Sequence, residues 1–93
     1  MAIGSATIDF GVSPGGTACQ VNVTGQTSIL SGSVVNAYLM AETSADHTID
    51  DHLAASTVIG LVCGAVVGGT GFTIYARARL TTIGRYTVRW VWV

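Results

Sequence analysis

The segment from Arg85 to Val93, which reads RYTVRWVWV, decides the fold of this chain. Side chains alternate between the two faces of a β-strand, and one face here is wholly apolar and aromatic: Tyr86, Val88, Trp90 and Trp92. That face must be buried. The opposite face starts with arginines and ends with valines, so the end of the strand is apolar on both sides. We expect other strands or another subunit to cover it, because an exposed apolar strand aggregates.

Composition favours one small β domain that is buried in an assembly. The chain has 93 residues, 49% of them hydrophobic and only 10% charged, against a usual charged share of about 25%. These values exclude disorder, which needs low hydrophobicity and high charge. A single domain of this length buries one modest core. The remaining apolar surface predicts association with copies of the chain or with a larger particle.

We expect neither a membrane span nor a secretory signal. The most apolar stretch, Val58 to Val67, is interrupted by two glycines and is about half as long as a spanning helix. No basic segment precedes an apolar run near residue 1, as a signal peptide would require.

The charges are few and segregated. All five acidic residues lie before residue 52, all four arginines lie after residue 76, and lysine is absent. Two interpretations fit: the charges join neighbouring subunits, or the arginines solvate the outer faces of two strands. The first gives a set of candidate interface residues: Arg77, Arg79, Arg85, Arg89, Trp90 and Trp92. A net charge of −1 disfavours nucleic acid as a partner.

Five further segments have strand character, several of them with clear alternation: Ala2–Phe10, Ala18–Thr24, Ser33–Ala41, Thr57–Val67 and Phe72–Leu80. Glycine-rich turns separate most of them. The pattern predicts an all-β fold, an antiparallel sandwich or small barrel of six to eight short strands.

Finer features follow from the same patterns. We expect hairpins at 12–17, where Pro14 and Gly15 suit a type II turn, at 68–71, and between the last two strands. Ser33–Ala41 has apolar groups on both faces, which is typical of a central strand. The glycines of 57–67 indicate a bulge, a bend or a split into two short strands, and Leu80 is expected to face inward.

Residues 43–53 hold the only dense set of titratable groups. Thr48 and Asp51 resemble the capping pair of one short helical turn. The residue types of His47, Asp50, Asp51 and His52 are those of metal ligands or acid–base groups. Because the histidines are five residues apart, they do not share a helix face. A solvated loop or a polar interface is the favoured interpretation, and no catalytic, cofactor or metal residue is assigned.

The two cysteines, Cys19 and Cys63, both lie in apolar strand segments. Buried free thiols are the default for such positions. A disulfide between them stays open if the two strands are adjacent or face each other across the core.

Several segments resemble a family of small proteins encoded among the structural genes of tailed bacteriophages. They are Ala6–Gly11 (ATIDFG), Val21–Gln26 (VNVTGQ), Leu39–Thr43 with Asp46–His47 (LMAET, DH), Gly71–Ala76 (GFTIYA) and Val88–Trp92 (VRWVW). The resemblance implies a place in the virion, as a capsid decoration protein or a small tail or fibre-attachment component. It carries no agreed functional residues.

The leading hypothesis is therefore a virion structural protein, not an enzyme, that associates with itself as a trimer or larger and with other virion proteins. The alternative is a receptor- or carbohydrate-binding module of a tail fibre, with Tyr38 or Tyr75 stacking on sugar rings. No triad-like or paired-carboxylate spacing supports a hydrolase.

Overall fold

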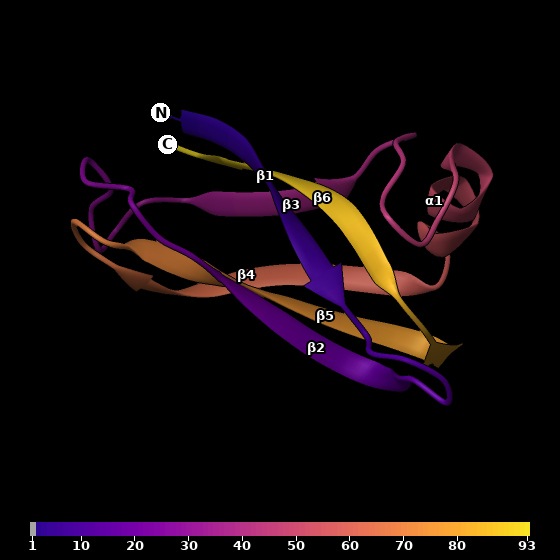
Figure 1. Ribbon diagram of the computed structural model, residues 1–93. Helices are drawn as coiled ribbons and strands as arrows, with labels where there is room; N and C mark the ends of the chain where they lie inside the picture. The colour runs from indigo at the N-terminus through magenta and orange to yellow at the C-terminus, as the bar shows by residue number, and fades with distance from the viewer. Residues whose placement is uncertain (1) are drawn as a thin grey trace.

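The fold is a two-layer β-sandwich. A computed structural model describes residues 2–93. Its elements are β1 (Ala2–Asp9), β2 (Gly16–Val23), β3 (Val35–Leu39), α1 (Ile49–Ala55), β4 (Ile59–Val67), β5 (Gly71–Thr82) and β6 (Arg85–Trp92). The strands form two antiparallel three-stranded sheets, β1-β6-β3 and β2-β5-β4. The sheets lie face to face, with α1 at one end (Figure 1). The expected all-β antiparallel sandwich is confirmed.

Strand β6 lies at the centre of its sheet, between β1 and β3. Its predicted inner face is buried, with Tyr86, Val88, Trp90 and Trp92 at most 7% exposed. The Trp90 ring crosses the interlayer space to meet Phe72 of β5 edge-on, with ring centroids 5.4 Å apart. Edge-on contacts of this kind add to the stabilisation from burial. The last strand is thus covered by two neighbouring strands and by the opposite sheet.

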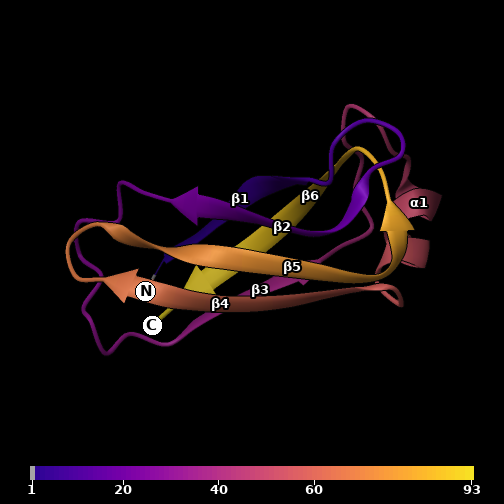
Figure 2. The ribbon, with the colours of Figure 1, turned by 90° about the horizontal axis from the view of Figure 1, so that it is seen from below.

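Two connections expected to be hairpins instead cross between the sheets. β1 and β2 lie in different sheets, as do β5 and β6, and Figure 2 shows β5 curving at its end to reach the other layer. The physical reason is that β5 already pairs with β2 on one side and β4 on the other. No edge of β5 is left for β6. The predicted type II turn, with Pro14 and Gly15 at its centre, would span residues 13–16. Instead the Gly15 N–H donates to the Val12 carbonyl at 2.7 Å, so the turn spans residues 12–15.

Strand β3 is an edge strand, so its predicted central position is wrong. The apolar groups on its outer side are exposed rather than covered, with Val34 at 69% and Met40 at 49%. Leu80 also departs from prediction, since it is 66% exposed. The register between β2 and β5 shifts at this point: Ala18 pairs with Arg77, but Gly16 pairs with Thr82. Four residues of β5, 78–81, therefore lie opposite residue 17 of β2. This irregularity disrupts the alternation that would have turned Leu80 inward.

Other local predictions are confirmed. β4 and β5 form the expected hairpin, and β4 carries a bulge between Gly64 and Val67, where Ala65 has a φ of 51°. Thr48 caps α1 through a full capping box with Asp51, and the helix runs for seven residues rather than one turn. Within residues 2–93, no helix combines the length and apolarity needed to cross a bilayer.

Cys19 and Cys63 are both free and half-buried. Cys19 pairs in register with Ala76 and Cys63 with Ile74, so the two thiols flank β5 on opposite sides. Two strand spacings, about 10 Å, separate them, which is too far for a disulfide. Burial raises the pKa of both thiols.

Gly4 of β1 gives a test of how closely the β6 tryptophans are packed. It lies opposite Trp90, and a Cβ at this position would stand 2.4 Å from the indole. We expect Gly4→Ala to lower the free energy of unfolding by about 1–3 kcal/mol, since the buried ring must shift to make room. Urea denaturation measures the change.

The matched control is Gly32→Ala. A Cβ at Gly32 meets nothing within 4 Å, so this variant should stay within about 0.5 kcal/mol of wild type. Equal stability of the two variants would contradict the packing of Trp90 on Gly4.

Candidate interaction surface

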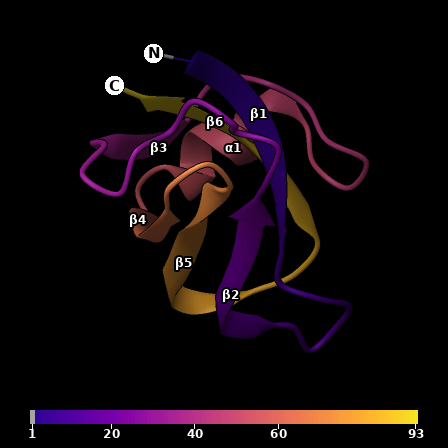
Figure 3. The same cartoon turned by 90° about the vertical axis from the view of Figure 1, so that its left-hand side faces the viewer.

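The outer face of the β1-β6-β3 sheet is apolar at one end. Ile3 of β1 lies opposite Val91 of β6. Beyond β6, Val93 and Val34 exchange two backbone hydrogen bonds of 3.0 Å. Ile3, Val34 and Val93 are 74%, 69% and 63% exposed. We call Ile3, Val34, Val91 and Val93 the terminal apolar patch. It lies where β1 begins and β6 ends (Figure 3), at the end of the sandwich opposite α1 (Figure 1).

The other end of this face is polar, because the segment after β3 folds back over β6. Arg89 donates from Nε to both carboxylate oxygens of Glu42 at 3.0 Å, and its Nη2 also contacts this carboxylate. Arg85 donates to Asp46 from Nε at 2.9 Å and from its backbone N–H at 2.8 Å. Two of the four arginines therefore find their acidic partners inside the chain.

These pairs shift the titration of both partners. Hydrogen bonding from the Arg89 side chain lowers the pKa of Glu42, and the Arg85 side chain and backbone do the same for Asp46. The pKa values of Arg85 and Arg89 are raised in turn by the carboxylates they face. Both pairs are partly exposed to solvent, with Arg85 and Arg89 side chains 49% and 44% exposed, so each pair contributes modestly to stability.

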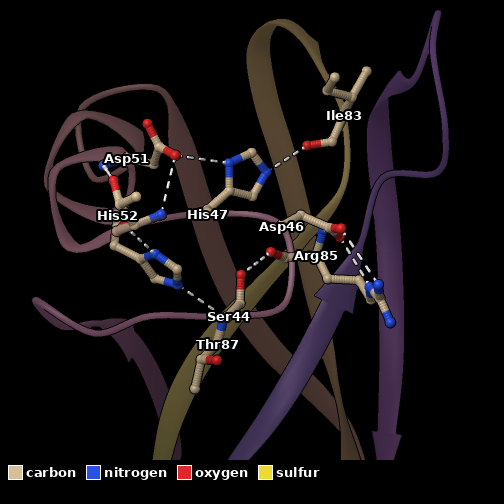
Figure 4. Close-up of polar contacts among 9 residues, drawn as sticks. Ser44, Asp46, His47, Asp51, His52, Ile83, Arg85 and Thr87 are labelled. Atoms are coloured by element: carbon tan, nitrogen blue, oxygen red, sulfur yellow. Dashed lines mark hydrogen bonds and ion pairs between the residues drawn. The ribbon is translucent and has the colours of Figure 1, made fainter.

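His52 of α1 fastens the helix to β6, as Figure 4 shows. The ring is 1% exposed. Nε2 accepts the backbone N–H of Thr87 at 3.0 Å, and Nδ1 lies 3.0 Å from the Thr48 carbonyl. Because a carbonyl can only accept and an N–H can only donate, this geometry requires a neutral imidazole with its proton on Nδ1. Both ring nitrogens are therefore used by backbone groups.

His47 makes the second attachment. Its ring stacks on Tyr86 of β6, with centroids 4.0 Å apart and planes within 9°. Nε2 lies 2.8 Å from the Ile83 carbonyl, and Nδ1 lies 3.3 Å from Asp51 Oδ2. The pKa of Asp51 is lowered first by the Thr48 backbone N–H and then by His47, while burial raises the pKa of Tyr86. We refer to His47, Thr48, Asp51 and His52 as the histidine clasp.

The histidine clasp differs from what the spacing of the two histidines predicts. The favoured solvated loop is wrong for His52, which is buried. The two rings do come together, 6.5 Å between centroids, because His47 precedes the helix and folds onto Tyr86. His52 and Ala55, three residues apart, form the buried side of α1, and this spacing is the signal that predicts His52 inward. Within residues 2–93, no three His, Cys, Asp or Glu side chains converge as metal ligands would.

The six candidate interface residues do not share one surface. Arg85 and Arg89 lie on the outer face described above, whereas Trp90 and Trp92 lie in the core at 6% exposure. Arg77 and Arg79 are exposed on β5 in the opposite sheet, where no ion pair engages them among residues 2–93. The interface role of these residues stays a prediction.

Comparison of the chain with protein-family models, with curated proteins and with solved structures gave no match.

Replacing His52 tests the clasp. His52→Leu replaces the imidazole with an apolar side chain of similar size and leaves the partly buried Thr87 backbone N–H without its acceptor. We expect the free energy of unfolding to fall by about 1–3 kcal/mol, the cost of an unsatisfied buried polar group. Chemical denaturation followed by tryptophan fluorescence measures it. The control is Leu53→Ala, one residue along α1 and 53% exposed, which should be nearly neutral. If both variants match wild type, the clasp does not hold the helix.

The ion pairs predict acid sensitivity. A carboxyl with a lowered pKa in the folded state contributes stability above its unfolded pKa, and this contribution is lost as the pH falls through the folded value. With ordinary values of 4.5 for Glu42 and 3.8 for Asp46, the loss begins below about pH 4.5. The double variant Glu42→Gln/Asp46→Asn should be less stable than wild type at pH 7. Its urea midpoint should fall less on acidification. Parallel pH profiles of the two proteins would contradict this.

Proposed function

We propose that this chain is a structural component of a bacteriophage virion that associates with copies of itself and with other virion proteins. The observation that carries the proposal is the terminal apolar patch, which lies open on the outer face of a sheet. A contiguous exposed apolar surface on a small, charge-poor domain favours an interaction site. The segments that resemble phage structural proteins supply the virion context.

The chemistry of the rest of the surface supports a scaffold role. Further large apolar side chains are exposed on loops, on strands and on α1: Val12, Leu30, Leu53, Val62, Val67, Leu80 and Ile83. The hydrogen-bonded polar groups of the histidine clasp and of the two ion pairs serve the fold itself. A protein with these features contributes by binding neighbours, as a capsid decoration protein or as a tail or fibre adaptor.

Arg77 and Arg79 are suited to contact another virion protein. Both extend from the outer face of the β2-β5-β4 sheet, on the opposite side from the terminal apolar patch. Arginine forms planar, two-point contacts with carboxylates. An acidic strip on a neighbouring virion protein is the expected counterpart.

Native mass tests the self-association. Light scattering on the purified protein should give the mass of a trimer or a larger oligomer at micromolar concentration, since the patch is hidden only by association. Mass spectrometry of purified particles of the virus that encodes the chain should detect it. A strict monomer at millimolar concentration, or absence from the particles, would contradict the proposal.

A second candidate function is carbohydrate binding. Tyr38 of β3 is 40% exposed on the same outer face as the apolar patch, and aromatic rings of this kind can stack on sugars. A glycan array separates the two functions: the structural role predicts no binding, whereas a signal lost in Tyr38→Ala would favour the receptor-binding role.

A further inference from the structure

The charges are distributed over the strands in an unusual way. All four arginines lie on β5 and β6, the central strands of the two sheets. The four edge strands contain no lysine, arginine or proline, and their single charge is Asp9 at the end of β1. Monomeric β proteins normally place charges and prolines on the edges, where they prevent pairing with other chains. Here the edges lack this protection.

Three of the four edge strands have other features that hinder pairing with another chain. β3 is only five residues long, and short edge strands offer few unpaired backbone groups. β4 is interrupted by its bulge, and β2 has a register shift between Gly16 and Ala18. β1 has no such feature. All eight of its residues stay in unbroken register with β6, and none of the described ladders pairs its other edge.

We propose that the free edge of β1 pairs antiparallel with β1 of a second copy of this chain, across a two-fold axis at Ser5. The inference rests on the proposed self-association and adds one two-chain contact to it. This pairing, called the β1 joint below, would make one continuous six-stranded sheet from the two β1-β6-β3 sheets. Its strand order would be β3-β6-β1 in one copy followed by β1-β6-β3 in the second. Pairing at this edge leaves the terminal apolar patch on the outer face of the joined sheet, where further chains cover it, so the expected oligomer of three or more chains then holds an even number of them. Two-fold contacts of this kind are the commonest way in which identical chains associate.

The residue pairs that antiparallel β1–β1 pairing would create suit a second copy of this chain as the partner. Residues directly opposite in an antiparallel pair point to the same face, so outward Ile3, Ser5 and Thr7 must meet outward residues. With the axis at Ser5, Ser5 meets its own copy, Ile3 meets Thr7 and Gly4 meets Ala6. Every pair is small or β-branched, and strands favour such residues. The core-facing residues of both copies stay in their own cores.

Electrostatics permits the β1 joint. The paired segment 2–8 carries no charged side chain, so pairing brings no like charges opposite each other. The nearest cation is Arg89, which lies beside Ser5 on β6 and is neutralised by Glu42. The two Arg89 side chains would stand three strand spacings apart, about 14 Å.

Ser5→Lys tests the proposal with a matched control. A lysine at the axis sets two like charges side by side on the β1 joint, which is how natural edges prevent pairing. Native mass should fall to half the wild-type value at a concentration where wild type is fully associated. Gln20→Lys adds the same charge to the exposed outer side of β2 and should keep the wild-type mass. Retention of full mass by Ser5→Lys overturns the proposal.

Amide hydrogen exchange gives a second readout that does not depend on the mass of the variant. In wild type, the β1 amides that point away from β6 should exchange slowly at high protein concentration and at least about tenfold faster on dilution into the monomer range. The β2 edge amides should show no such concentration dependence. Fast exchange of the β1 amides at all concentrations overturns the proposal.

The outcomes separate this contact from the proposed function. A stable oligomer with an odd number of chains, or one that Ser5→Lys leaves intact, refutes β1 pairing while self-association stands. An even oligomer that Ser5→Lys splits, formed by a chain absent from virus particles, supports β1 pairing and refutes the virion role. A strict monomer refutes both.

Discussion

Burial of the inner face of β6 is the constraint on which the rest of the structure depends. Two tryptophans on one short strand need neighbours on every side, and the fold supplies them: β1 and β3 flank the strand, Phe72 meets Trp90 from the opposite layer, and Gln26 accepts the Trp92 indole N–H at 3.0 Å. β5 is the centre of the other sheet, with β2 on one side and β4 on the other. It therefore has no edge left to pair with β6. The sheet-crossing connections follow from this arrangement.

Local features of this fold could be predicted from sequence, whereas strand partners could not. Alternation placed Trp90 and Trp92 in the core, and the spacing of Thr48 and Asp51 located the start of α1. Alternation is the same, however, whether successive strands pair side by side or face each other across a core. That ambiguity explains the two false hairpins and the misplacement of β3. Leu80 was misjudged because alternation ends where the register shifts, and nothing in the local sequence marks that point.

The candidate surface was predictable in part. The apolar end of β6 was visible as Val91 and Val93, but its extension through Ile3 and Val34 needs the pairing of three strands. The segregation of acids and arginines along the chain turned out to be partly internal, since the segment after β3 returns to β6 and neutralises Arg85 and Arg89. The spacing of His52 and Ala55 signals that His52 faces inward, but its partner on β6, the Thr87 backbone N–H, lies 35 residues away and could not be found from local sequence.

The start of β1 and the end of β6 emerge side by side at one pole of the sandwich, the pole opposite α1 (Figure 1). A tag or reporter domain fused at either end of the chain would thus sit beside the terminal apolar patch and cover it. The loop after β1, which includes exposed Gly11 and Val12, lies at the far pole. A peptide inserted into that loop would leave the terminal apolar patch uncovered, which makes the loop the better site for peptide display.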